Sequence, residues 1–428
     1  MNIVKFNFGF LKSISIYLVS IILNKSVSLV LLPILAAYIS IEEYGSISYY
    51  QVLISFITPL IGMNMSTVLS KYFFKKNKKE FRLLIINVIY LSLFAFIVVI
   101  SFISLGNMLF NLYGKSLIPI YWIYFLPILA ISISINEYNT TLLRFEKKPI
   151  KYAFFEVSRA GIDFITSLIL VVVYLSGWQG RLYGILLSAI LICFISIFRI
   201  IKKYKLTFSK IDTTLIKDIL LISLPLIPHA YGSVIISLGD RLLIEHFLNL
   251  KSLGLYSVSY QVSSLILFII VAINRLWSPW IYERLSVSEQ NGKNDIVRFS
   301  YIVIIGLVLV VFLISMCAKF LLPLLFPGEF LSSISLIIVI SFSFVFYAMY
   351  TMIFPLLIHF NKSNFLGLSS GIGAITNTCL NILLIPKFGI MGAAFSTLVS
   401  YFIIFLLVFI YSTTLIKLPW LKKIEINE

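Results

Sequence analysis

The chain has 428 residues, of which 60% are hydrophobic and 12% charged, whereas a soluble globular domain carries about 25% charged residues. Its mean hydropathy of +1.04 excludes a soluble protein. The net charge of +17 comes from short basic runs beside apolar stretches, a pattern typical of cytoplasmic loops in membrane proteins. No nucleic-acid partner is therefore expected.

Twelve apolar runs are long enough to cross the bilayer, because about 20 residues of helix span about 30 Å of hydrocarbon. They cover residues 13–40, 45–68, 83–105, 117–139, 152–176 and 182–200 in the first half and 215–247, 254–282, 299–319, 331–358, 364–385 and 391–414 in the second. The first run is longer than a signal-peptide core and no small-residue cleavage site follows it, so it is expected to remain as a helix.

Lys and Arg are distributed unevenly between the two sets of loops. The N-terminus, the loops that join an even span to the next odd one, and the C-terminus together hold 25 of them. The opposite loops hold five: Lys115, Arg181, Lys251, Lys319 and Lys387. Because positive charge marks the cytoplasmic side, both termini are expected in the cytoplasm.

Weak internal repetition indicates two related halves, an arrangement common in transporters. Three pairs match at similar offsets: Gly45-x-x-Ser48 with Gly254-x-x-Ser257, Tyr50-Gln51-Val52 with Tyr260-Gln261-Val262, and Gly184-x-x-x-Ser188 with Gly392-x-x-x-Ser396. A basic connection, 199–217, joins the halves. We therefore expect an N-terminal lobe at residues 1–208 and a C-terminal lobe at 209–428, each with six helices.

Ionisable residues at bilayer depth are the best candidates for a site, because they normally face a bundle interior or a watery cavity. Lys25 lies near the middle of the first span, where it is either a paired buried amine or a substrate contact. Glu156, Arg159 and Asp163 share one face of the fifth span. They form either a self-neutralising ladder or part of a cavity wall that couples transport to a cation.

The second half offers a further set of candidates. Asp240 and Arg241 lie in the seventh span, where Arg241 can pair with Glu245 one turn later. Arg275 either grips phosphate or snorkels to the headgroups. His229, after Pro228, is a titratable residue in an apolar stretch and is either packing or functional.

Other side chains in these spans have structural interpretations. The tryptophans around Arg275 are expected to anchor the interface. Prolines 33, 59, 225, 228 and 355 lie within spans and favour kinks.

No local signature of an enzyme or a metal site is present. The chain has no GxxxxGK[ST] phosphate loop and no HExxH. Cys193, Cys317 and Cys379 lie in separate apolar runs without metal-ligand spacing. We expect no cofactor and no metal.

Four segments resemble the polysaccharide-biosynthesis flippases of the multidrug/oligosaccharidyl-lipid/polysaccharide exporter superfamily. They are Leu224-Pro225-Leu226-Ile227-Pro228-His229, Gly239-Asp240-Arg241, Gly254-Leu255-Tyr256-Ser257 and Trp277-Ser278-Pro279-Trp280-Ile281-Tyr282-Glu283. The run 32–38, followed by Glu43-Tyr44-Gly45, is similar to that family's first hairpin. The resemblance implies an all-α integral membrane protein with about twelve transmembrane helices in two pseudo-repeated lobes, forming a V-shaped, alternating-access transporter.

The resemblance also implies a function, that of a Wzx-type flippase. Such a protein moves an undecaprenyl-pyrophosphate-linked oligosaccharide from the cytoplasmic to the outer leaflet of the bacterial inner membrane, for O-antigen of lipopolysaccharide, capsule or exopolysaccharide. Its cationic central cavity would hold Lys25, Arg159, Arg241 and Arg275, with Glu156, Asp163, His229 and Asp240 in coupling or gating. Membrane lipid, a polysaccharide polymerase and chain-length proteins are its expected partners, and no covalent bond changes.

Three alternatives remain open. A cation-coupled drug antiporter of the same superfamily shares the helix count, although cationic drugs prefer acidic cavities. Peptidoglycan-precursor flippases typically have fourteen helices, two more than are predicted here. A membrane-embedded glycan-processing enzyme needs a catalytic acid in a sizeable outer loop, and the outer loops offer only Glu42, Glu43 and Glu329, which are more simply solvated charges.

Overall fold

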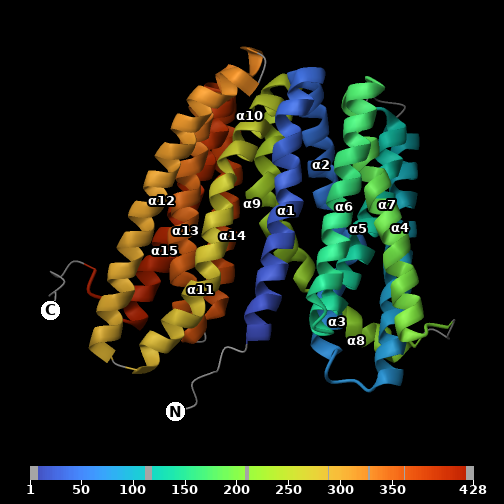
Figure 1. Cartoon of the computed structure of the whole chain (residues 1–428), viewed down its shortest axis with the longest axis horizontal. Helices are drawn as coiled ribbons and strands as arrows, with labels where there is room; N and C mark the ends of the chain where they lie inside the picture. The colour runs from blue at the N-terminus through green and yellow to red at the C-terminus, as the bar shows by residue number, and fades with distance from the viewer. Residues whose placement is uncertain are drawn as a thin grey trace. The chain divides into compact units, whose positions relative to one another are not determined.

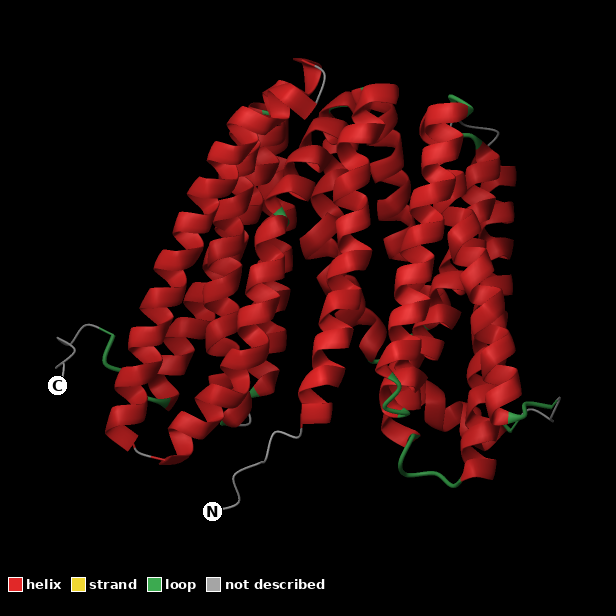
Figure 2. Cartoon of the chain, in the orientation of Figure 1, coloured by secondary structure: helices red, strands yellow, loops and turns green. Residues whose placement is uncertain are grey.

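The computed structural model describes residues 8–110, 118–207, 212–287, 289–325, 328–360 and 362–420, and this part of the chain is helical with no strand (Figure 2). The predicted all-α architecture is confirmed. The chain divides into two compact units, Met1–Tyr231 and Gly232–Glu428.

The first unit contains eight α-helices, one π-helical turn and the start of a ninth helix (Figure 1). These are α1 (Phe8–Tyr38), α2 (Ile41–Gly62), α3 (Met65–Tyr72), α4 (Lys78–Phe110), α5 (Ile120–Phe145), α6 (Pro149–Leu168), η1 (Ile169–Val173), α7 (Gly177–Tyr204) and α8 (Thr213–Ser223). Helix α6 packs against α1 and α7, and α5 packs against α2 and α7. This packing positions the charged residues of α6 between two neighbouring helices.

The second unit contains most of α9 and the helices that follow it. They are α9 (Leu226–Phe247), α10 (Leu250–Ser263), α11 (Leu265–Val287), α12 (Glu289–Leu325), the 3₁₀ turn η2 (Gly328–Ser333), α13 (Ile334–His359), α14 (Ser363–Phe388) and α15 (Ile390–Leu415). Helix α13 is the centre of this unit, because it contacts α10, α11, α12 and α15.

The boundary between the compact units falls later in the chain than the lobe boundary expected after residue 208. Helix α8 packs against α3 and α4 of the first unit. The first turns of α9 are tied to the same unit, because Asn64 Nδ2 donates to the Leu226 carbonyl (3.1 Å) and Tyr231 Oη to the Phe56 carbonyl (2.7 Å). The lobe boundary at 208 therefore stays a prediction about the internal repeat.

Each of the twelve predicted spans corresponds to a helix or a broken pair of helices. Within the described residues, nine segments are long and apolar enough to cross a membrane, or ten if the bent pair α2–α3 is one span. Helices α1 and α6 occupy the two remaining predicted spans, and α6 carries four charged residues. Large apolar side chains such as Phe94, Phe102 and Phe194 are exposed, as expected for surfaces that face lipid.

Two of the expected proline breaks are visible. Pro59 lies near the end of α2, and the helix stops at Met63 and Asn64, which have positive φ angles of 44° and 50°. Helix α3 then leaves at a bend of 42°. Pro225 lies in the turn between α8 and α9, where the missing backbone donor interrupts the hydrogen-bond ladder.

Glu43 has a structural role that the sequence did not reveal. Its side chain accepts from the backbone of Ser40 (2.8 Å) while Ser40 Oγ accepts from the Glu43 amide (3.2 Å), which together form a capping box at the start of α2. Glu43 Oε1 also accepts from the Trp178 amide at the start of α7. Its expected interpretation as a solvated loop charge is therefore wrong.

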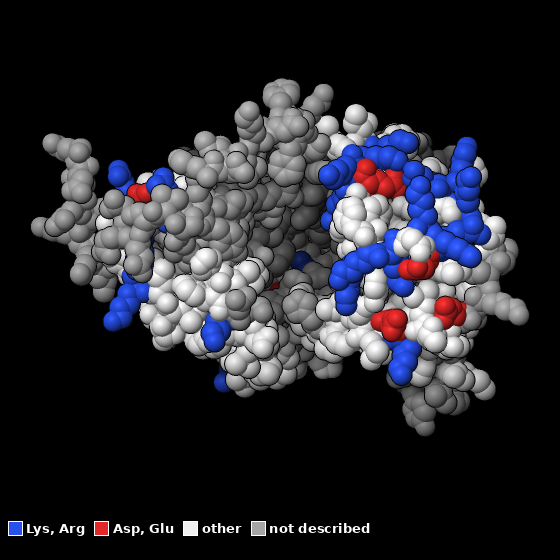
Figure 3. Space-filling view, turned by 90° about the horizontal axis from the view of Figure 1, so that it is seen from below, with Lys and Arg blue, Asp and Glu red and all other residues white. Residues whose placement is uncertain are grey.

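Basic side chains crowd one face of the first unit (Figure 3). The sequence is rich in Lys and Arg from the end of α3 to the start of α4, from the end of α5 to the start of α6, and at the end of α7: Lys71, Lys75, Lys76, Lys78, Lys79, Arg82, Arg144, Lys147, Lys148, Lys151, Lys202, Lys203 and Lys205. These are three of the loops that the charge count assigns to a single side of the membrane, and within this unit they do meet at one face.

Candidate functional site

In the second unit, Asp240 of α9 is a buried carboxylate held by a tyrosine. The residue is 1% exposed, and its Oδ2 accepts a hydrogen bond from Tyr256 Oη of α10. The other oxygen, Oδ1, is buried and has no hydrogen-bond partner among the described residues. A buried acceptor without a partner destabilises the fold. A proton or a cation bound to Oδ1 would remove this cost, so the carboxylate is suited to hold either one.

Arg241 follows Asp240 and is also buried, at 7% exposed. Its Nη1 donates to the Ser237 carbonyl one turn back (3.1 Å), and its guanidinium carbon lies 4.5 Å from the centroid of the Tyr260 ring. No described ion pair joins it to Glu245, so the possible pairing along the helix is not formed. Helical side chains lean toward the N-terminus of their helix, which explains why Arg241 reaches back and not forward.

Aromatic rings and hydroxyls surround this pair. Tyr260 of α10 packs edge-on against Phe344 of α13, with 5.5 Å between the ring centroids. The ring centroids of Tyr401 of α15 and Tyr347 of α13 are 5.3 Å apart. The candidate site in the second unit therefore consists of an acid and a base embedded among tyrosines. The sequence contains a signal for this site, since Tyr256 and Tyr260 are one helical turn apart, but this spacing does not say what the two tyrosines face.

In the first unit, Asp163 of α6 forms an ion pair that the sequence did not predict. Arg181 Nη1 donates to its Oδ1, and Nη2 donates to its Oδ2 at 3.1 Å. Arg181 Nη1 also donates to Ser167 Oγ at 2.7 Å. Arg181 is only 5% exposed and lies in the first turns of α7, so its assignment to an outer loop is wrong.

Of the two interpretations left open for the charges of α6, the self-neutralising ladder is not the one that the described contacts form. Asp163 pairs with α7, while Glu156 Oε2 accepts from Asn24 Nδ2 of α1. Arg159, which is half-buried, forms no hydrogen bond or ion pair with any described residue. Of the three candidates Glu156, Arg159 and Asp163, Arg159 alone has no hydrogen-bond or ion-pair partner among the described residues.

Three other candidates have side chains outside the described set: Lys25, His229 and Arg275. Their helices are described, and their proposed roles stay predictions. Trp277, close to Arg275, is 2% exposed and donates from Nε1 to the Met352 carbonyl (2.7 Å). It is a buried packing residue, so the expectation that it anchors the interface is wrong.

A further charged cluster in the first unit joins the end of α5 to α7. The Glu146 carboxylate accepts from Arg199 (2.6 Å), Tyr204 (2.8 Å) and Lys148 (2.9 Å). Burial raises the pKa of this carboxyl, and the hydrogen bonds from Lys148, Tyr204 and Arg199 lower it. The lowering is the larger effect, so the pKa of Glu146 lies below its ordinary value. The cluster fixes two helices at the basic face and is best explained as structural.

No group of three or more His, Cys, Asp or Glu that could hold a metal ion occurs among the described residues. The described polar groups could instead bind an anion or exchange a proton.

Comparison with known proteins gives the family. The model of the family described as "Polysaccharide biosynthesis protein" matches residues 10–284. A Haemophilus influenzae protein of the Lsg locus is 28% identical over 282 residues, which cover 63% of this chain and 65% of the relative. This chain thus matches slightly less than two thirds of that relative's length. A second H. influenzae membrane protein is 28% identical over 301 residues, 68% of this chain and 69% of its own.

Solved structures show the fold. The lipid II flippase MurJ in an inward closed conformation superposes with a TM-score of 0.73 at 19% identity, covering 92% of this chain and 87% of that one. A Vibrio cholerae MATE transporter superposes with a TM-score of 0.64 at 14% identity, covering 95% of this chain and 96% of that one. The chain therefore belongs to the polysaccharide biosynthesis protein family, and it is a multi-pass membrane protein with the fold shared by the MATE transporter and MurJ.

Proposed function

We propose that this protein is a flippase for a polyprenyl-pyrophosphate-linked oligosaccharide, which it moves from the cytoplasmic to the outer leaflet of the bacterial inner membrane. The family match over residues 10–284 carries the proposal. The superposition on MurJ, a lipid II flippase, supports it. The flipped oligosaccharide would be built into O-antigen, capsule or exopolysaccharide by a polymerase and chain-length proteins that act after the flippase.

Basic residues within the spans provide the physical means. A pyrophosphate cannot enter hydrocarbon without compensation for its lost hydration. Arg241 offers a guanidinium already desolvated against Tyr260, and Arg159 offers one without a described partner. We propose both as anion contacts, with Lys25 and Arg275 as further candidates. A guanidinium suits this role because its planar set of donors matches phosphate oxygens.

The membrane potential could drive the outward movement of the anionic substrate. With a negative cell interior, outward movement of an anion gains about 2.3 kcal/mol per charge per 100 mV. Among the described coupling candidates, Asp240 has the unpartnered oxygen, whereas Asp163 is engaged by Arg181 and Glu156 by Asn24. We therefore rank Asp240 first for proton or cation coupling, and keep His229 as a gating candidate.

One observation favours a second function, that of a cation-coupled drug antiporter. The MATE superposition covers 95% of this chain, and the free oxygen of Asp240 would suit a cation as well as a proton. A drug antiporter needs no anion contact, so neutralisation of Arg241 separates the two functions.

The test is deletion of the gene in its host, followed by lipid extraction and a leaflet assay for the lipid-linked repeat unit. We expect the unit to accumulate on the cytoplasmic face and the surface glycan to be lost. Complementation with Arg241→Gln should fail, while Arg298→Gln, an exposed basic residue of the same unit, should restore the glycan. Normal surface glycan with raised drug sensitivity would instead establish the antiporter.

A further inference from the structure

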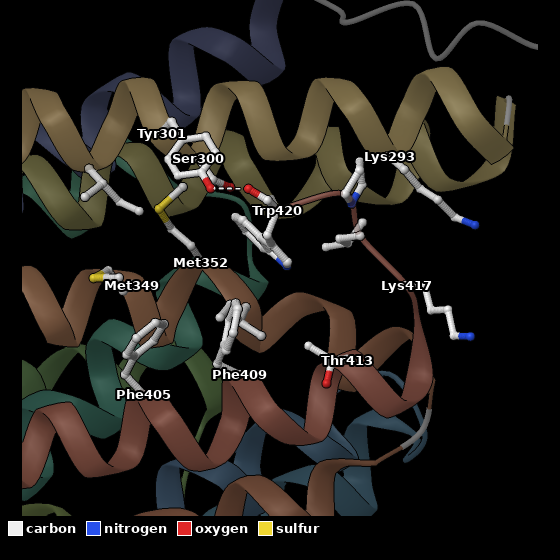
Figure 4. Close-up of a pocket in the computed structure, with 14 residues that line it drawn as sticks. Lys293, Ser300, Tyr301, Met349, Met352, Phe405, Phe409, Thr413, Lys417 and Trp420 are labelled. Carbon is white, nitrogen blue, oxygen red and sulfur yellow. Dashed lines mark hydrogen bonds between the residues drawn. The ribbon is translucent and has the colours of Figure 1, made fainter. Parts of the chain in front are cut away.

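The second unit contains a cavity of about 840 Å³ that the proposed transport does not use. It lies among α12, α13, α15 and the segment that follows α15 (Figure 4). Its wall is largely apolar and includes Ile304, Met349, Met352, Phe405 and Phe409. Flexible methionine and aromatic side chains adapt to an apolar guest of irregular shape.

The chain itself builds one side of this cavity. After α15 the backbone becomes extended at Ile416, with φ −147° and ψ 127°. The Trp420 carbonyl then accepts a hydrogen bond from Tyr301 Oη of α12 (2.5 Å). The Trp420 ring lies 5.5 Å from Phe409 and 6.0 Å from Tyr301. Trp420 is thus a fixed wall of the cavity.

Two lysines lie at one end of the cavity, apart from Met349 and Phe405 (Figure 4). Lys293 belongs to the first turns of α12, and Lys417 to the segment after α15. The described lining contains no Asp or Glu. An apolar chamber with a basic end matches a molecule that has a long hydrocarbon chain and an anionic head.

We propose that this cavity binds an anionic phospholipid of the surrounding membrane. One acyl chain enters among Met349, Met352 and Phe405, and the phosphate lies between Lys293 and Lys417. Basic pockets between transmembrane helices on the cytoplasmic side are suited to anionic headgroups. Both lysines belong to segments that the charge distribution assigns to that side. The apolar wall distinguishes this ligand from free phosphate.

The test uses the full-length protein purified in detergent and incubated with phosphatidylglycerol or with phosphatidylcholine of the same acyl chains. Lipid retention is measured by native mass spectrometry, and stability by thermal unfolding. We expect retained phosphatidylglycerol and a raised unfolding temperature with that lipid alone. Lys293→Gln with Lys417→Gln should weaken retention by roughly thirtyfold, the effect expected from two basic residues near an anionic lipid.

A matched control removes the same charge elsewhere. Lys151→Gln with Lys203→Gln changes two exposed lysines of the first unit that do not line the cavity, and should leave retention unchanged. Met349→Trp fills the cavity while both lysines remain, and should also abolish retention. Ile304→Phe is a smaller replacement with the same purpose, should the tryptophan variant not fold.

Three outcomes would overturn the proposal: equal retention of both phospholipids, equal loss in the control pair, or unchanged retention in both cavity-filling variants. Competition with a polyprenyl phosphate is a fourth test. If it displaces phosphatidylglycerol at equal concentration, the cavity prefers the isoprenoid lipid, and the proposal that its ligand is a membrane phospholipid is overturned. None of these readouts depends on transport, so they are independent of the proposed function.

Discussion

Arg181 of α7 donates to both carboxylate oxygens of Asp163 on α6 and so joins two neighbouring helices of the first unit. The side chains are 6% and 17% exposed, respectively. The pair neutralises two charges that would each be costly in hydrocarbon. It also removes Asp163 from the group of freely available acids.

The first prediction concerns this ion pair. Asp163→Leu and Arg181→Met should each lower the free energy of unfolding by about 3–5 kcal/mol, because each leaves one buried charge without its partner. The double variant should be more stable than the sum of the two losses predicts. Thermal unfolding of all four proteins in one detergent gives the comparison. Additive losses would show that the two residues act independently.

The second prediction concerns the close approach of α6 and α7. A Cβ atom on Gly184 would overlap Ser167 Oγ and would lie 2.9 Å from the Ser167 backbone nitrogen. Gly184→Ala should therefore force the helices apart at the serine that binds Arg181, and cost about 1–3 kcal/mol.

Gly161 provides the matched control, because a Cβ there would meet nothing within 4 Å. Gly161→Ala lies within α6 and should be neutral or stabilise the protein by up to about 1 kcal/mol. The two alanine variants are compared by their unfolding temperatures. Equal behaviour would mean that helix packing at Gly184 is looser than its contacts indicate.

The helical fold was largely predictable from the sequence, and the reason is physical. A backbone in lipid must satisfy its own hydrogen bonds, so long apolar runs become helices wherever they enter the bilayer. The predicted spans 83–105 and 391–414 accordingly lie inside α4 and α15. The bend after Pro59 was also visible as a proline within an apolar run.

The partners of the charged residues were not predictable in the same way. Spacing along one helix allows a ladder of Glu156, Arg159 and Asp163. The described partners of Glu156 and Asp163 lie instead on α1 and α7, and local spacing does not say which helices will be neighbours. Arg181 shows a second cause of error. A charge near the edge of an apolar run looks like a loop residue, although here it points into the packed helices.

The third prediction concerns the pH dependence of the Glu146 cluster. The pKa of this carboxyl is lower in the folded protein than its unfolded value of about 4.3. Its contribution to stability is therefore complete above that value and is lost as the pH falls through the folded-state pKa. Glu146→Gln should cost about 1–3 kcal/mol at neutral pH, because the hydrogen bonds involve a charged group.

Unfolding temperatures measured across pH test this directly. The difference between the wild type and Glu146→Gln should be constant from roughly pH 6 to 8 and shrink below about pH 4. Glu80→Gln is the control, since Glu80 is 52% exposed and lies 4.0 Å from Lys76, a surface pair worth about 0–1 kcal/mol. A difference that grows in acid would contradict the assignment.

The last prediction concerns the guanidinium of Arg241 over the Tyr260 ring. If this arginine contacts the anionic head of the substrate, Arg241→Gln should abolish complementation in the surface-glycan assay. Arg241→Lys should restore it only in part, because an ammonium keeps the charge but lacks the planar donor set. Tyr260→Phe keeps the ring face and should complement, whereas Tyr260→Leu removes the stacking partner and should not.

Each variant must first be shown to reach the membrane at the wild-type level, because Arg241 is buried and its loss could unfold the second unit. A well-folded Arg241→Gln that flips normally would remove this residue from the substrate path. The anion contact would then have to come from Arg159 or from another basic side chain. If Tyr260→Leu complements normally in the surface-glycan assay and Arg241→Gln does not, the charge of Arg241 is required and the Tyr260 ring has only a packing role.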